Sequence, residues 1–276
     1  MLYFVATPIG NLKDISLRAL EILKSVDIIA CEDTRKTSIL LNHYDIHKRL
    51  ISYHKNNEKT SAEGIIKLLE SGQNIAVVSD AGMPVISDPG NILVKKLQEN
   101  NLEYSVIPGA NAGLSALLLS GFDASKFMFV GFLMGSKKSK TETLENIKNL
   151  DASLIFYVAP HDVLDTLDFL HGVLGDRRAC LVKEITKMFE TLEIFTLGET
   201  PCMDLKGEFV LIVEGAGDIQ NPLANLTLEE QIEFYMSSGL DRKSAIKKVA
   251  KENKIKNIYK VLEENQLIKR WYRLWV

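Results

Sequence analysis

Short apolar runs alternate with stretches of helical period through the first half of this 276-residue chain, and this alternation constrains the fold more than any other feature. Residues 2–6 form an apolar run that ends in a Pro/Gly turn, and residues 16–26 then place leucines and isoleucine on one side of a helix. Runs that are apolar throughout are typical of parallel strands covered on both faces. The sequence therefore predicts βα units around a parallel, doubly wound sheet. Its further strands are expected at residues 28–31, 49–53, 75–78 and 104–107.

Helix signals and a change in composition divide the chain. Thr60 and Glu63 have the spacing of a capping box, which predicts that a helix starts there and stops at Gly72. Residues 135–140 (GSKKSK) are polar and basic, and we expect a domain boundary there. Strand-like and helix-like runs alternate again beyond it, and the pattern after residue 221 is helical. The predicted parts are an N-terminal α/β domain (1–134), a smaller α/β domain (135–220) and a basic helical C-terminal extension (221–276).

Charge is distributed unevenly along the chain. The net charge is −3, yet residues 241–276 hold 11 lysines and arginines against 4 aspartates and glutamates, a net charge of +7. A basic helical segment is typical of a contact with a phosphate-rich partner, and also of a solvated helix face. Both interpretations stay open at this point.

Several classes of protein lack their signals in this sequence. The chain has no apolar run of the roughly 20 residues that a membrane span needs, and it begins without a secretory signal. Its three cysteines are widely spaced and its histidines form no zinc-type cluster, so we expect reduced thiols, no metal and a cytoplasmic location. Dinucleotide, P-loop and hydrolase motifs are missing as well.

Three glycine-containing loops follow predicted strands, at residues 8–11, 79–90 and 108–113. Open α/β sheets bind ligands at the carboxyl ends of their strands. The second loop contains the pattern Ser-Asp-x-Gly twice, and Gly82 and Gly90 permit positive φ and close approach of a ligand. Each loop can also be an ordinary turn or a helix-to-sheet contact, but together they predict a cofactor site.

A family resemblance runs in order along nearly the whole chain. The chain resembles the bacterial ribosomal small-subunit methyltransferase I family, which belongs to the tetrapyrrole methylase superfamily. The segments that carry the resemblance are 5–12 (VATPIGNL), 30–35 (ACEDTR), 51–54 (ISYH), 79–90 (SDAGMPVISDPG), 107–109 (IPG), 156–157 with 160–161 (FY and PH) and 184–187 (EITK).

The resemblance implies a fold and an activity. The fold would be two α/β domains of the tetrapyrrole methylase type, with the cofactor in the cleft between them, plus the C-terminal helical extension. The activity would be methyl transfer from S-adenosyl-L-methionine to the ribose 2′-oxygen of a cytidine in the decoding region of 16S rRNA, with the substrate presented within the small ribosomal subunit. The resemblance also implies a homodimer.

Individual residues follow from the matched motifs. By similarity, the cofactor-binding residues would be Pro8, Ala81, Gly82, Met83, Ile86, Asn111, Ala112, Val158 and Ile185. Ribose methylation needs a base for the hydroxyl proton, and the candidates on loops near the cleft are Glu32, Asp33, His54 and Glu184. Their alternative roles are helix capping and ion pairing. Phosphate contacts would come from Arg35, Lys137, Lys138 and Lys140, or these are solvated surface side chains.

Two other functions remain to be distinguished. One is methylation of a tetrapyrrole, against which the basic C-terminal segment argues. The other is a non-catalytic role in ribosome assembly, which the complete set of cofactor loops disfavours. Methylation of a base carbon commonly uses a cysteine nucleophile, and Cys202 lies far in sequence from the cofactor loops. A covalent route is therefore not expected, which agrees with the attack by a ribose hydroxyl that the family resemblance implies.

Overall fold

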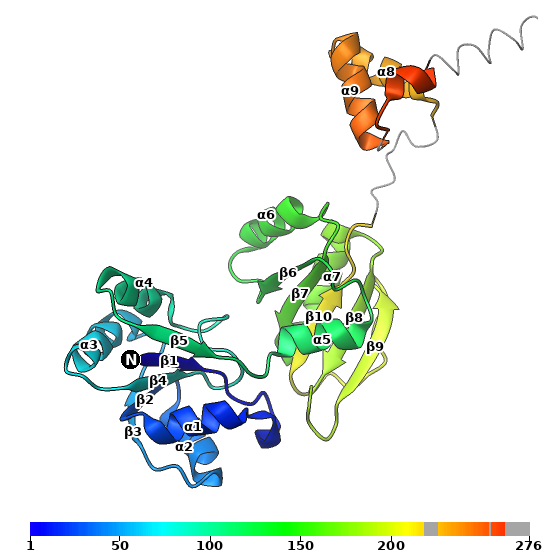
Figure 1. Ribbon diagram of the computed structural model, residues 1–276. Helices are drawn as coiled ribbons and strands as arrows, with labels where there is room; N and C mark the ends of the chain where they lie inside the picture. The colour runs from blue at the N-terminus through cyan, green and yellow to red at the C-terminus, as the bar shows by residue number, and fades with distance from the viewer. Residues whose placement is uncertain (218–225, 254, 263–276) are drawn as a thin grey trace, which may run out of the picture. The chain divides into compact units, whose positions relative to one another are not determined.

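The structure, a computed structural model, describes residues 1–217, 226–253 and 255–262 and divides into two compact units (Figure 1). The first unit, residues 1–216, contains two five-stranded sheets. The second unit, residues 217–276, contains helices in its described part. Each unit has its own apolar core.

The first sheet is parallel throughout and has the strand order β3-β2-β4-β1-β5. This arrangement confirms the predicted doubly wound sheet. Its strands are β1 (Leu2–Val5), β2 (Ile28–Cys31), β3 (Arg49–Ser52), β4 (Ile75–Val78) and β5 (Tyr104–Ile107).

Alternate residues of these strands pack on opposite faces of the sheet, as the two-residue period of a strand requires. Leu2 and Phe4 of β1 pack with the cluster of α3 and α4, whereas Val5 packs with that of α1 and α2 (Figure 1). Both faces are therefore covered, which explains why the strands are apolar throughout. The helices are α1 (Leu17–Ser25), after the short 3-10 turn η1 (Leu12–Asp14), α2 (Thr34–His43), α3 (Glu58–Glu70) and α4 (Asn91–Glu99).

Helix α3 begins earlier than the capping-box spacing predicts. Its N-cap is Asn57, and Glu58 stands in its first turn, so the predicted start at Thr60 is wrong. The Asn57 side chain accepts a hydrogen bond from the amide of His54 at 2.8 Å and donates to the carbonyl of Ser52 at 3.3 Å. These bonds close the turn before α3, so helical geometry is established before Thr60 is reached.

The second sheet is mixed. Its order is β6-β7-β10-β8-β9, with β6 parallel to β7 and the other neighbours antiparallel. Its strands are β6 (Phe127–Gly131), β7 (Ser153–Val158), β8 (Arg178–Lys183), β9 (Thr191–Thr196) and β10 (Phe209–Val213). One face packs against α5 (Ala112–Ser120), and the other against α6 (Lys137–Ile147) and α7 (Val163–Leu174), which follows the short turn η2 (Pro160–Asp162).

The change from one sheet to the other falls before β6, and thus earlier than residue 135. Both α5 and β6 belong with the second sheet, although they precede the predicted boundary. Strand β6 belongs to the second sheet because it hydrogen-bonds to β7. The composition of residues 127–133 does not indicate this pairing. The domain limits themselves stay a prediction.

The second unit contains a pair of helices, α8 (Leu228–Ser237) and α9 (Arg242–Glu252). Thr227 and Glu230 form a capping box at the start of α8, and Asp241 caps α9 through the amides of Lys243 and Ser244. Residues 221–225, 254 and 263–276 of the predicted helical extension, and residues 218–220 of the predicted second domain, lie outside the described residues. In the part of the chain that the structure describes, no helix combines the length and the apolar character needed to cross a membrane.

Candidate active site

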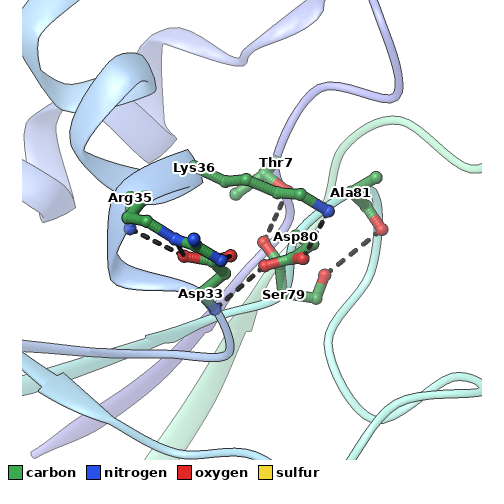
Figure 2. Close-up of polar contacts among 7 residues, drawn as sticks. All are labelled: Thr7, Asp33, Arg35, Lys36, Ser79, Asp80 and Ala81. Carbon is green, nitrogen blue, oxygen red and sulfur yellow. Dashed lines mark hydrogen bonds and ion pairs between the residues drawn. The ribbon is translucent and has the colours of Figure 1, made fainter.

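The first two glycine loops are tied together where β1 and β4 end. Thr7 and Gly82 exchange two backbone hydrogen bonds, of 2.9 Å from the Thr7 amide and 3.1 Å from the Gly82 amide. The Thr7 hydroxyl donates to the carbonyl of Ser79 at 3.2 Å, as Figure 2 shows. Residues 72 positions apart in the sequence thus form one rigid rim at the carboxyl edge of the sheet.

A cavity of about 380 Å³ lies beside this rim, within the size range of small-molecule sites. We call it the donor cavity. It brings together eight of the nine residues expected to bind a cofactor, which are Ala81, Gly82, Met83, Ile86, Asn111, Ala112, Val158 and Ile185. Pro8 is buried and does not line it. Residues from loops of both sheets therefore meet at one place, while their cofactor role stays a prediction.

The walls of the donor cavity are largely apolar, with polar groups at a few positions. Phe132 and Tyr157 stand edge to face with ring centroids 5.5 Å apart. Asn111 uses its side-chain oxygen to cap α5, accepting from the amide of Leu114 at 2.9 Å, so only its other groups can face a ligand. Ten further residues line the cavity without being among the expected ones, namely Ile9, Ser87, Asp88, Phe132, Tyr157, Ala159, Pro160, Glu208, Phe209 and Val210.

Asp88 is the most informative of the missed residues. Burial raises the pKa of its carboxyl to about 6, and the nearby Glu32 and Asp80 carboxylates add to the rise, against a hydrogen bond from Ser79. A half-buried carboxylate whose pKa is raised by neighbouring carboxylates favours a positively charged ligand. The second Ser-Asp-x-Gly pattern was the signal that pointed to it.

A second, polar cavity of about 480 Å³ opens on the other side of the 79–81 turn, and we call it the polar cavity. Asp80 lines it, whereas the next residue, Ala81, lines the donor cavity. The polar cavity brings together three of the four candidate bases and the candidate phosphate ligand Arg35. Its lining is Glu32, Asp33, Thr34, Arg35, Ser52, His54, Lys55, Asn56 and Asp80.

Asp33 is committed to hydrogen bonds within this cavity (Figure 2). It caps α2 through the amide of Arg35 at 2.8 Å, and the Arg35 guanidinium binds both of its oxygens, at 3.0 and 2.7 Å. These bonds from Arg35 hold the pKa of Asp33 well below its usual range. Asp33 is therefore a poor proton acceptor, because its lone pairs are occupied and its conjugate acid is strong.

Asp80 is tied to α2 as well. It accepts from the Asp33 amide at 3.1 Å and from Lys36 Nζ at 2.7 Å (Figure 2). The cofactor loop and the start of α2 are thereby joined. Glu32, at the end of β2, differs from both aspartates, because burial and then the Asp80 carboxylate raise its pKa. A carboxylate with a raised pKa holds a proton more readily, so Glu32 is the better base.

Glu184 lies at neither cavity. Its Oε1 accepts from the amide of Glu208 at 2.8 Å and from Lys187 Nζ at 3.0 Å, and the same ammonium binds Glu208 at 2.8 Å. The Glu208 amide and Lys187 hold the pKa of Glu184 below its usual value. The fourth candidate base is thus a fixed anion that links the ends of β8 and β10.

The three candidate lysines of the basic stretch also lie apart from the cavities. Lys137, Lys138 and Lys140 occupy the first turn of α6, where Ser136 is the N-cap. Lys138 Nζ approaches Glu142 at 3.9 Å on the same helix, a spacing typical of a solvated helix face. In the part of the chain that the structure describes, no group of three histidine, cysteine, aspartate or glutamate side chains is arranged to hold a metal ion.

The comparisons with known proteins agree with this geometry. The profile of the family Tetrapyrrole (Corrin/Porphyrin) Methylases matches residues 1–201, which includes every residue of the polar cavity and most of the donor cavity. A relative from Halalkalibacterium halodurans, "Ribosomal RNA small subunit methyltransferase I", is 43% identical over 273 residues, 95% of this chain and 94% of the relative. The protein of that name from Haemophilus influenzae is 46% identical over 222 residues, 78% of each chain.

The chain belongs to the ribosomal RNA small subunit methyltransferase I family of the tetrapyrrole methylases. It is therefore an enzyme, a methyltransferase. Solved structures share the fold at low identity. Diphthine synthase has a TM-score of 0.64 at 15% identity, covering 78% of this chain and 90% of its own. Uroporphyrin-III-C-methyltransferase from Thermus thermophilus has a TM-score of 0.57 at 15% identity, covering 80% and 97%.

Proposed function

We propose that this methyltransferase uses S-adenosyl-L-methionine to methylate the ribose 2′-oxygen of a cytidine in the decoding region of 16S rRNA. The observation that carries the proposal is the pair of adjoining cavities on either side of the 79–81 turn, one largely apolar and one polar. The names of the relatives, which are methyltransferases of small-subunit ribosomal RNA, support the choice of substrate.

The donor cavity suits S-adenosylmethionine in size, polarity and charge. Phe132 and Tyr157 offer apolar surfaces for an adenine ring, and Asp88 offers a negative charge for the cationic part of the molecule. When bound, the donor supplies a methyl group on a positively charged sulfur that is already electrophilic. The protein's task is then to align the acceptor hydroxyl and remove its proton.

Glu32 is the residue we propose for the proton. It lines the polar cavity together with His54, and its raised pKa favours proton uptake at an Oε atom. Asp33 and Glu184 are excluded by the hydrogen bonds that lower their pKa values. Arg35 stands at the mouth of the same cavity with its side chain 88% exposed, where it can meet a phosphate of the RNA.

The second unit supplies a basic surface. The exposed side of α9 carries Arg242, Lys243, Lys247, Lys248 and Lys251. Such a surface attracts the RNA backbone without reading its sequence. We therefore propose that residues 241–276, with their net charge of +7, hold the small ribosomal subunit or its RNA while the two cavities act on one nucleotide. The compartment we propose is the cytoplasm, where this substrate is found.

We propose a homodimer as well, and helix α5 supports it. One side of α5 packs on the second sheet through Ala116 and Leu117. Its other side leaves Leu118 80% exposed and Leu114 48% exposed. An apolar helix face of this kind marks an interface. Sedimentation analysis should show a dimer for the wild-type protein and a monomer for Leu118→Lys.

Methylation of isolated 16S rRNA and of small subunits with radiolabelled donor tests the proposed function. Nucleosides from the product should contain 2′-O-methylcytidine by mass spectrometry, and a tetrapyrrole substrate should take up no label. Cys202→Ser should stay active, because Cys202 is exposed, lines neither cavity and only donates its backbone amide to Glu193. A methyl group on a base, or an inactive but folded Cys202→Ser protein, would contradict the proposal.

A further inference from the structure

The 79–90 loop leads directly into a helix that has no cap of its own. Helix α4 begins at Asn91, and its N-cap, Gly90, has no side chain to accept a hydrogen bond. The first amides of a helix need acceptors from outside it. Here the acceptor comes from another helix, since Glu58 Oε1 accepts from the amide of Gly90 at 2.8 Å and from that of Ile92 at 3.2 Å.

The loop before this cap is strained. Val85 and Ser87 have φ angles of 75° and 68°, in the left-handed region that side chains disfavour, most of all β-branched ones. Such conformations persist only where the surroundings hold them. Gly90 packs on Val85 so closely that a Cβ at Gly90 would lie 2.4 Å from Val85 Cγ2. Val85, in the strained part of the loop, therefore packs against Gly90, and the amide of Gly90 is bound by Glu58.

Glu58 is itself fixed in place. The hydroxyl of Tyr53, a side chain only 2% exposed, donates to Glu58 Oε1 at 3.3 Å. Glu58 also stands in the first turn of α3, where the helix dipole favours a carboxylate. One oxygen thus receives hydrogen bonds from the core and from the start of α4. It does so about thirty residues away from the loop in sequence, which hides the link from sequence analysis.

We propose that Glu58 is a positioning residue for the methyl donor. By capping α4 from α3, it holds residues 85–90 in the conformation in which Ile86, Ser87 and Asp88 line the donor cavity. The inference rests on the proposed function, and it adds a residue that does not line the cavity itself.

Donor affinity of three variants tests the proposal. Glu58→Ala should raise the Kd for S-adenosylmethionine by about tenfold or more, the effect of losing a hydrogen bond to a charged acceptor. Glu58→Gln should restore most of the affinity, because its amide oxygen can accept the same two bonds. The matched control is Glu63→Ala. Glu63 joins the same two helices through Lys96 at 3.5 Å but has no contact with the loop, so its loss should leave the Kd unchanged. Calorimetry measures all three.

A second readout needs no donor. In the ligand-free Glu58→Ala protein, hydrogen exchange should speed up at the amides of Gly90 and Ile92, while β4 stays protected as in the wild type. Unchanged exchange at these two amides, or an unchanged Kd, would overturn the proposal. A wild-type protein that fails to bind S-adenosylmethionine would overturn the proposed function instead, and the exchange result would still decide whether Glu58 holds the loop.

If Glu58→Ala fails to fold, Glu58→Asp and Glu58→Gln in the full chain are compared instead. The aspartate keeps the charge but is one methylene too short to reach both amides, so it should weaken donor binding, whereas the glutamine should not. The reverse order would show that charge rather than the cap matters, and would refute the positioning role.

Discussion

The donor cavity and the polar cavity adjoin at consecutive residues, Ala81 and Asp80, yet they are built in different ways. The donor cavity takes its walls from segments of both sheets and is largely apolar, with a half-buried carboxylate, Asp88, that has a raised pKa. The polar cavity takes its walls from the segments that follow β2, β3 and β4, including the start of α2, and its Asp33 and Asp80 form ion pairs with Arg35 and Lys36. If the donor cavity binds the donor and the polar cavity the acceptor, variants in one should affect mainly its own ligand, although the Glu32 and Asp80 carboxylates still influence the pKa of Asp88 across the 79–81 turn.

The largest effect is expected in the polar cavity. Glu32→Gln should lower kcat by about 10²–10⁴, the usual contribution of a general base, with the donor Kd unchanged. Single-turnover methylation of small subunits and calorimetry measure the two quantities. Glu184→Gln is the control, because its carboxylate lies at neither cavity. Full activity of Glu32→Gln would transfer the role of base to His54.

Gly82→Val should produce the largest loss of donor affinity. Gly82 has a φ of 79°, and a Cβ there would lie 3.2 Å from Ile9 Cγ2, so the Ile9 side chain, which lines the donor cavity, must give way. We expect the Kd for S-adenosylmethionine to rise by about a hundredfold or more, from backbone strain of about 1–2 kcal/mol and the lost geometry.

A matched variant separates strain from the site. Gly72 has a φ of 89° but nothing within 4 Å of an added Cβ, and it follows α3 away from both cavities. Gly72→Val should destabilise the protein in thermal unfolding and leave donor affinity intact. RNA binding should survive both changes. Equal loss of donor affinity in the two variants would mean that strain alone, and not the rim, is responsible.

We expect Asp88 to make donor binding depend on pH. Its pKa is about 6 in the folded protein, so donor affinity should fall about tenfold per pH unit below that value as the carboxylate is neutralised. Asp88→Asn should bind S-adenosylmethionine about ten- to a hundredfold more weakly at pH 7 and should lose this pH dependence. Calorimetry between pH 5 and pH 8 checks both statements.

The stability of the ligand-free protein should change in the opposite direction. The folded pKa of Asp88 lies above its ordinary value of 3.8, so its contribution to stability is present below that value and is lost as the pH rises through about 6. Asp88→Asn should therefore raise the Tm at pH 7 by roughly a few degrees, and this increase in Tm should vanish near pH 4. A lower Tm at pH 7 would show that the ionised form is stabilised by a partner.

The smallest effect concerns the mouth of the polar cavity. Arg35→Gln should weaken binding of 16S rRNA a few-fold and reduce its salt slope by about 1, as the loss of one phosphate contact requires. Arg49→Gln is the control, because Arg49 is the first residue of β3 and the polar cavity lies at the carboxyl end of that strand. An unchanged salt slope in the Arg35→Gln protein would mean that the Arg35 guanidinium of the wild type binds Asp33 and contacts no phosphate of the RNA.

Several elements and contacts could be predicted from local pattern. Strands β2, β4 and β5 lie where the apolar runs predict them, and the three glycine loops at strand ends supply nine of the eighteen residues that line the donor cavity. The start of α3 was mistaken, because a capping-box spacing at Thr60 competes with the turn that Asn57 closes. Local signals locate elements well only where no longer-range contact overrides them.

The sequence by itself determined the parallel sheet, the glycine loops and the family, because period, composition and motif order are properties of neighbouring residues. Only the tertiary structure shows which acidic residues have a raised pKa and which have a lowered one, and our proposal of Glu32 as the base rests on that difference. Hydrogen bonds from Arg35, Lys187 and backbone amides lower the pKa values of Asp33 and Glu184. Burial and neighbouring carboxylates raise the pKa values of Glu32 and Asp88. A pKa depends on burial and on charges brought close by folding. Arg35 and Lys187 are near neighbours in sequence of the carboxylates whose pKa values they lower, whereas Glu32 and Asp88 meet only because the end of β2 and the loop after β4 are brought together by folding, so no local stretch of sequence contains that information.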